Sequence, residues 1–138
     1  MIKLIIGNKG SGKTKKLIDL VNSCVETSSG NVVCIENEPK LTYDISSKAR
    51  LLETESYNIK GHKAFYGFLA GICAGNYDVT EILVDATFTI VGRDYDKLPQ
   101  FFEMLSELSE ATDVCFYFTI SCDKEDLPVE IFDYCEEL

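Results

Sequence analysis

Residues 7–14, GNKGSGKT, follow a short apolar run at residues 2–6, IKLII. The stretch matches the pattern G-x-x-x-x-G-K-[ST], and apolar residues at helical spacing begin directly after it. Glycine allows backbone conformations that a side chain would block, so successive N–H groups can converge on one point. The first turn of the following helix adds a partial positive charge. The stretch therefore predicts an anion-binding loop between a strand and a helix.

Two side chains at the end of the loop have specific roles in such a site. The Lys13 ammonium group supplies a positive charge for the β- and γ-phosphates of a nucleoside triphosphate, and the Thr14 hydroxyl is a ligand for Mg²⁺. We therefore expect ATP and Mg²⁺ as ligands. The residues expected to contact the nucleotide are Gly7, Asn8, Lys9, Gly10, Ser11, Gly12, Lys13, Thr14 and Lys15.

The length and composition of the chain fit one globular domain. Its 138 residues are enough to bury a core, and its hydrophobic fraction of 46% is ordinary for such proteins. No apolar segment approaches the ~18 residues that a membrane span needs. The apolar run at residues 2–6 is also too short for a secretory signal. We therefore expect a single domain over residues 1–138 in the cytoplasm, without a membrane partner.

Six cysteines are scattered along the chain, and no two of them form a Cys-x-x-Cys pair. Zinc sites usually take their ligands in close pairs, and disulfides need an oxidising compartment. We therefore expect these cysteines to act as small buried hydrophobic residues.

The net charge of −10 makes binding to nucleic acid unfavourable, because the protein would repel the phosphate backbone. The charge is unevenly distributed, however. The last sixteen positions carry seven acidic residues and one lysine. Five of the 13 basic residues lie within the first sixteen positions, namely Lys3, Lys9, Lys13, Lys15 and Lys16. An anion would therefore be attracted to the region of the predicted loop.

Apolar patterns of two kinds alternate along the chain. Continuous apolar runs predict buried strands at residues 2–6, 31–36, 81–86 and 114–121. Apolar residues at helical spacing predict helices at residues 13–28, 61–77 and 96–111. Gly30 is expected to end the first helix as its C′ residue, and Pro99 fits the first turn of the third.

Two segments are more ambiguous. Residues 50–56, RLLETES, suggest a further strand, and the last twelve residues fit either a short helix or an edge strand. Strands that alternate with helices form a parallel sheet with helices on both faces. The expected fold is therefore a three-layer α/β/α sandwich with a mostly parallel central sheet.

Asp85 directly follows three apolar residues in the predicted strand at residues 81–86, EILVDA. A magnesium ion bound to a triphosphate usually needs an aspartate at the end of a strand near the loop. We therefore expect Thr14 and Asp85 to form the metal site.

The loop, its flanking elements and Asp85 resemble the P-loop NTPase superfamily, and this resemblance extends over most of the chain. Several features are similar to its RecA-like branch, in which the final strand lies between the loop strand and the aspartate strand. The resemblance implies this position for residues 114–121, with Thr119 or Ser121 near the γ-phosphate. Within the branch, the layout is similar to the core of type II thymidine kinases.

The chain departs from those kinases at the catalytic base. They carry a glutamate directly after the strand aspartate, where this chain has Ala86, and a zinc lobe whose paired cysteines are absent here. RecA-like recombinases carry their base at the end of the strand that follows the loop helix, the region of Glu36 and Glu38. Either carboxylate has the reach to orient an attacking water, and two solvated acids in a turn would look the same. We expect Glu38, with Lys13, to be catalytic.

Charge on a transferred phosphoryl group usually needs a further cation. Arg93, in the segment after the Asp85 strand, is one candidate, and Arg50 is the other. The only histidine, His62, is expected to stand at the start of a helix rather than to act in catalysis.

Two kinds of function remain open on these grounds. One is an enzyme, a small ATPase or phosphotransferase that uses Mg-ATP. The other is a regulatory module, in which bound nucleotide alters a surface for a protein partner or a second copy of the chain and hydrolysis is slow or absent. ATP is favoured over GTP because no N-K-x-D stretch for guanine recognition is present.

Overall fold

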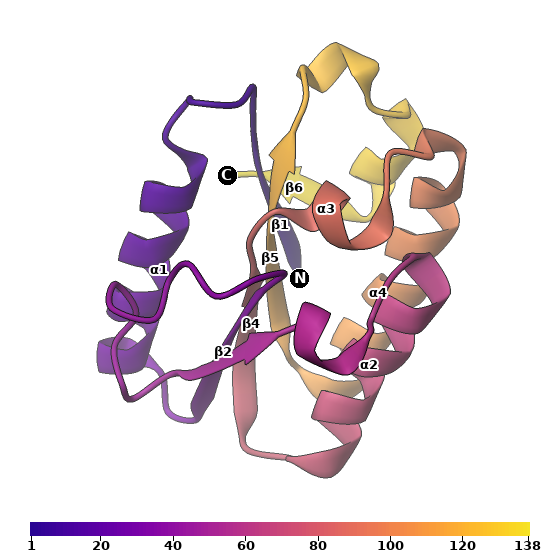
Figure 1. Cartoon of the computed structure of the whole chain (residues 1–138). Coiled ribbons are helices and arrows are strands. Elements are labelled where there is room, and N and C mark those ends of the chain that lie inside the picture. Colours follow the sequence, from indigo (N-terminus) through magenta and orange to yellow (C-terminus); the bar gives the residue numbers. More distant parts are fainter.

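A single sheet of six parallel strands forms the centre of the computed structural model, which describes residues 1–138 (Figure 1). The strand order is β3-β2-β4-β5-β1-β6, and every neighbouring pair is parallel. The strands are β1 (Ile2–Gly7), β2 (Asn31–Glu36), β3 (Arg50–Glu53), β4 (Val79–Val84), β5 (Cys115–Ser121) and β6 (Cys135–Glu137). The segment expected between the loop strand and the aspartate strand, β5, lies in that position.

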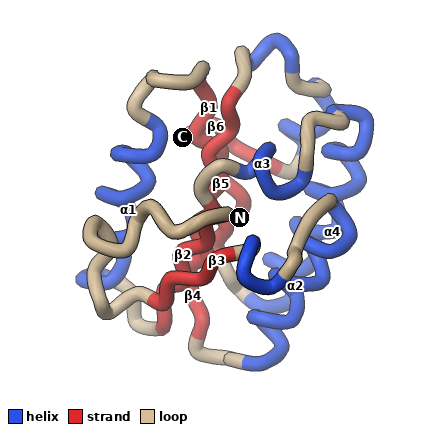
Figure 2. The backbone as a smooth tube through the Cα atoms, in the orientation of Figure 1, coloured by secondary structure: helices blue, strands red, loops and turns tan.

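Helices cover both faces of the sheet. They are α1 (Lys13–Thr27), α2 (His62–Gly75), α3 (Thr87–Val91) and α4 (Leu98–Thr112). Helix α1 covers one face, and α2, α3 and α4 lie on the other (Figure 2). Short 3-10 turns occur at Glu55–Tyr57, Tyr95–Lys97, Lys124–Asp126 and Val129–Asp133. The predicted three-layer α/β/α sandwich is confirmed, and this architecture is compatible with Rossmann-like and P-loop-like folds.

Each face of the sheet buries its own core. Under α1, the fully buried Leu17 and Val21 pack against β1, β2 and β4. The larger core lies under α2 and α4, where the rings of Phe102 and Phe118 meet edge to face at 5.7 Å between centroids. Because both faces are covered, the central strands are continuous apolar runs.

The structure assigns the two segments whose sequence pattern was ambiguous, and it contains one helix that was not predicted. The suggested strand at residues 50–56 is confirmed as the shorter β3, and the C-terminal segment contains both a 3-10 turn and the edge strand β6. Helix α3 was not predicted, because its sequence TFTIV is rich in β-branched residues. It forms where Ala86 adopts a left-handed conformation, with φ of 53°, and turns the chain away from the sheet.

The expectation that Gly30 is a C′ cap of the first helix is wrong. Helix α1 is capped by Ser28, which is extended and donates its backbone N–H to the Cys24 carbonyl. Glycine is required at position 30 for another reason. A Cβ there would lie 2.2 Å from the carbonyl oxygen of Asp78, so only glycine allows the chain to pass this closely.

All six cysteines are free thiols, and four of them are buried. Burial raises the pKa of Cys34 and that of Cys135 to about 12. These thiols therefore stay protonated and pack as small apolar groups. None of the helices combines the length and the apolar composition that crossing a membrane requires.

Helix α2 carries glycines at two exposed interior positions, Gly67 and Gly71, where an added Cβ would meet no atom within 4 Å. Close packing therefore does not require them. We predict that Gly71→Ala raises the free energy of unfolding by about 1 kcal/mol, because alanine loses less backbone entropy in a helix. Urea denaturation followed by circular dichroism measures the change.

The matched control is Gly30→Ala, which introduces the same methyl group into the contact with Asp78. This variant should lose at least about 1 kcal/mol of stability through overpacking. A stability loss in Gly71→Ala would contradict the open surface described for this face of α2.

Candidate functional site

The loop between β1 and α1 forms a tight turn at the carboxyl edge of the sheet. Gly10 and Gly12 both have φ of 85°, in the left-handed region that glycine adopts without steric cost. The Ser11 N–H donates to the Asn8 carbonyl at 3.1 Å and helps to close the turn. No acidic residue of α1 itself lies in its first turn, so the helix offers its positive end to the loop.

A cavity of about 410 Å³ lies beside this loop. Its loop and α1 lining consists of Lys9, Gly10, Gly12, Lys13, Thr14 and Lys15. The sheet side contributes Asp85, Ala86, Thr119 and Ser121. Six of the nine residues predicted to contact a nucleotide therefore line one cavity, whereas Gly7, Asn8 and Ser11 do not line it.

Asn8 links the loop to a residue that the sequence did not single out. The side-chain amide of Asn8 donates to the Asp123 carboxylate at 2.6 Å. The backbone carbonyl of Asn8 accepts a hydrogen bond from the Lys13 ammonium group at 3.0 Å. Asp123 follows β5, the neighbour of β1. The strand order expected from the RecA-like resemblance was the available signal, because it places the end of β5 next to the loop.

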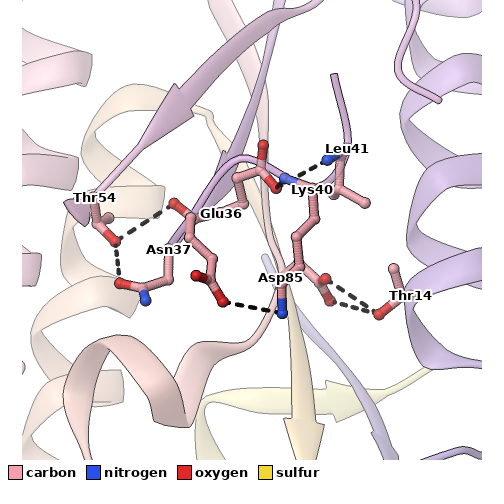
Figure 3. Close-up of polar contacts among 8 residues, drawn as sticks. Thr14, Glu36, Asn37, Lys40, Leu41, Thr54 and Asp85 are labelled. Atoms are coloured by element: carbon pink, nitrogen blue, oxygen red, sulfur yellow. Dashed lines mark hydrogen bonds and ion pairs between the residues drawn. The ribbon is translucent and has the colours of Figure 1, made fainter. Parts of the chain in front are cut away.

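Asp85 is the centre of the polar contacts below the loop. Its carboxylate oxygens accept hydrogen bonds from the Thr14 hydroxyl at 3.2 and 3.3 Å (Figure 3). The buried Thr119 hydroxyl donates to the same carboxylate at 2.8 Å and accepts from the Ala86 N–H at 2.9 Å. The two predicted metal ligands, Thr14 and Asp85, are thus in direct contact.

The donor set of this contact fits magnesium rather than a softer metal. Thr14 and Asp85 offer oxygen ligands at the wall of the cavity beside the loop. Mg²⁺ is usually held by one or two such groups together with phosphate oxygens and water. The chain holds no cluster of three or more His, Cys, Asp or Glu side chains able to bind a metal alone. A magnesium ion held by Thr14 and Asp85 would take its remaining ligands from phosphate oxygens and water.

A second, smaller cavity of about 220 Å³ adjoins the first and shares Thr14, Asp85 and Ala86 with it. Glu36 and Glu38 both line this cavity, but their environments differ. Glu38 is exposed and pairs with the Lys40 ammonium at 3.1 Å. The sequence favoured Glu38 as the catalytic acid, and the structure places both acids at this cavity, with Glu38 the more exposed of the two.

Glu36 is buried, with 3% of its surface exposed. Its Oε1 accepts hydrogen bonds from the backbone N–H groups of Lys40 at 2.9 Å and Leu41 at 3.1 Å (Figure 3). Its Oε2 is buried and has no hydrogen-bond partner. Burial raises the pKa of Glu36, the two backbone hydrogen bonds oppose this shift, and the charges of Glu53 and Asp85 add to it. One oxygen of the Glu36 carboxylate is therefore buried without a hydrogen bond.

The two arginines lie outside the cavity beside the loop. Arg93 donates to the Ser121 carbonyl at 3.0 Å, and its guanidinium group lies over the Phe88 ring at 5.1 Å. Arg50 is the first residue of β3, so it lies at the amino edge of the parallel sheet, opposite the loop. His62 is the first residue of α2, as expected.

No known protein family matches this chain, and a search of curated proteins finds no significant relative. The geometry and chemistry of the site therefore carry the functional conclusion.

The role of Thr119 gives a direct test of this arrangement. We predict that Thr119→Val lowers the free energy of unfolding by about 1–3 kcal/mol, because Asp85 loses a donor and the Ala86 N–H loses its acceptor. Thr119→Ser is the control, since it keeps the hydroxyl and should retain most of the stability. Urea denaturation of both variants measures the difference, and equal stability of Thr119→Val and the wild type would contradict the hydrogen-bond network.

Proposed function

We propose that the chain is a Mg²⁺-dependent ATPase whose phosphate-binding loop is residues 7–14. The observation that carries this proposal is the cavity in which the glycine loop, Lys13 and the Thr14–Asp85 contact meet. Its lining combines a glycine-rich turn, an ammonium group and a carboxylate beside a hydroxyl, the groups that binding of a metal–triphosphate uses.

The strand order supports a RecA-like P-loop NTPase fold within the observed α/β architecture. Strand β5 pairs with β1 on one side and with β4 on the other. This arrangement brings Thr119 and Ser121 to the wall of the cavity beside the loop. The Thr119 hydroxyl already donates a hydrogen bond to Asp85. The Ser121 hydroxyl is therefore the one that can contact a terminal phosphate.

In the proposed site, different residues bind the phosphates and the metal ion. Lys13 exchanges its hydrogen bond to the Asn8 carbonyl for phosphate oxygens, and the loop amides bind the remaining charge. Thr14 and Asp85 hold the magnesium ion, which neutralises the charge of the β- and γ-phosphates when bound.

The small cavity favours water as the acceptor. Its volume of about 220 Å³ lies below the roughly 300–1,000 Å³ of typical small-molecule sites. Glu36 lines this cavity and has one free carboxylate oxygen, so we infer that Glu36 orients and deprotonates the attacking water. A carboxylate pKa raised towards neutrality improves a general base. Glu38 is instead exposed and paired with the Lys40 ammonium group.

Removal of the Lys13 ammonium tests binding. We predict that Lys13→Ala weakens Mg-ATP binding by at least about tenfold, because a charge-assisted hydrogen bond contributes about 1.5–3 kcal/mol. Isothermal titration calorimetry with Mg-ATP and Mg-GTP measures the affinities. Lys16→Ala is the matched control, since Lys16 contacts the Leu138 carbonyl and does not line the cavity. A wild-type protein that binds neither nucleotide at millimolar concentration would overturn the proposal.

Substitution of Glu36 tests turnover separately from binding. Glu36→Gln keeps an oxygen for the two backbone N–H groups but removes the base, so we predict a fall in kcat of about 10²–10⁴-fold. The affinity for Mg-ATP should be unchanged. Phosphate release by the wild type should rise as the pH passes upward through the raised pKa of Glu36, because the base acts in its deprotonated form. The Gln variant should lack this rise.

Glu38→Gln is the control and should keep wild-type turnover. Loss of turnover in Glu38→Gln alone would assign the base to Glu38. A wild-type protein that binds Mg-ATP without releasing phosphate would instead be the nucleotide-dependent regulatory module.

A further inference from the structure

A third cavity lies between the first turns of α2 and α4. Its volume is about 710 Å³, within the roughly 300–1,000 Å³ range of small-molecule sites. It shares no lining residue with the cavity beside the loop or with the one beside Glu36. The proposed ATPase activity makes no use of it.

Positive charge dominates this cavity, although the protein as a whole has a net charge of −10. Lys60, Lys63 and Lys97 line it, and none of its lining residues is acidic. Lys60 and Lys63 form no ion pair, and Lys97 lies 3.9 Å from Asp94 in an exposed, weak pair. Such a concentration of lysine side chains attracts an anion.

The backbone adds to this field. Helix α2 begins at the cavity, and it has neither a side-chain cap nor an acidic residue in its first turn. No acidic residue of α2 itself therefore offsets the positive end of the helix. This contribution supplements the three ammonium groups.

The rest of the wall is apolar or aromatic. Tyr66, Phe101 and Met104 line the cavity, and the ring of His62 packs edge-on against Phe101 at 5.6 Å between centroids. The buried Nε2 of His62 has no hydrogen-bond partner. An occupant can therefore combine a flat apolar group with a charged group.

The geometry points to a binding site for a small organic phosphate, a molecule in which a phosphate ester carries an aromatic or apolar group. The lysines and the start of α2 bind the phosphate, and the aromatic wall packs against the organic part. This site is separate from the phosphate-binding loop, so its occupancy does not depend on Lys13.

The single histidine makes the test direct, because the imidazole resonances in an NMR spectrum belong to His62 alone. The probe is phenyl phosphate, titrated into the full-length Lys13→Ala variant to silence the loop. Saturable shifts of the His62 resonances are expected. Inorganic phosphate and phenol should each bind at least about tenfold more weakly, because each supplies only half of the contacts.

The pKa of His62 gives a second readout. In the free protein it is lowered by burial first and by the charge of Lys97 second, while Asp94 opposes the shift. A bound phosphate favours the protonated imidazole, so saturation with phenyl phosphate should raise the pKa of His62.

Lysine variants distinguish a built site from non-specific attraction. Lys63→Gln should weaken binding of phenyl phosphate by about two- to fivefold, and the double variant Lys60→Gln/Lys63→Gln by about tenfold. Lys48→Gln is the matched control, because Lys48 is an exposed lysine that pairs with Glu26 and does not line the cavity.

The inference is overturned if phenyl phosphate leaves the His62 resonances unchanged, or if phenol binds as well as phenyl phosphate. Equal affinities of the Lys13→Ala parent and of the same variant carrying Lys60→Gln/Lys63→Gln or Lys48→Gln would overturn it as well. Because the titration is done without Lys13, failure of Mg-ATP to bind the loop would leave its result unaffected.

Discussion

The hydrogen bonds of Asp85 hold the candidate site in a single arrangement. Its carboxylate accepts from Thr14 on α1 and Thr119 on β5, and its backbone N–H donates to the Ile35 carbonyl on β2 at 2.9 Å. One residue therefore connects three elements that are distant in sequence. The loop residues can form a cavity only because the sheet presents Asp85 next to the start of α1.

This arrangement depends on the parallel register of the strands. Val84, at the end of β4, is paired with Phe118 on one side and with Ile35 on the other. The next residue along each strand is therefore Asp85, Thr119 or Glu36, and all three lie at the same edge. Parallel pairing collects the ends of strands in this way, and ligands of open α/β sheets bind outside those ends.

The two carboxylates at this edge have different electrostatic environments. Asp85 has two hydroxyl donors, which stabilise its charge, whereas Glu36 is buried with two backbone N–H donors on one oxygen only. Burial and the nearby charge of Asp85 together disfavour the ionised form of Glu36. The pKa of Glu36 is therefore raised, and the two acids at the ends of neighbouring strands lie in different surroundings.

The sequence by itself determined the loop and the alternation of strands with helices. The spacing of Gly7, Gly12 and Lys13 is a local property, and the apolar runs that form the buried strands are local as well. The sequence also located Asp85, since an acid after three apolar residues marks the end of a buried strand.

Only the tertiary structure distinguished Glu36 from Glu38, because burial and the hydrogen bonds from Lys40 and Leu41 follow from how the chain folds back after β2. Three further features were found only in the structure. They are the contact between Asn8 and Asp123, the short helix α3 and the cavity between α2 and α4. Each depends on pairing between segments far apart in the chain, and no local pattern of residues specifies that pairing.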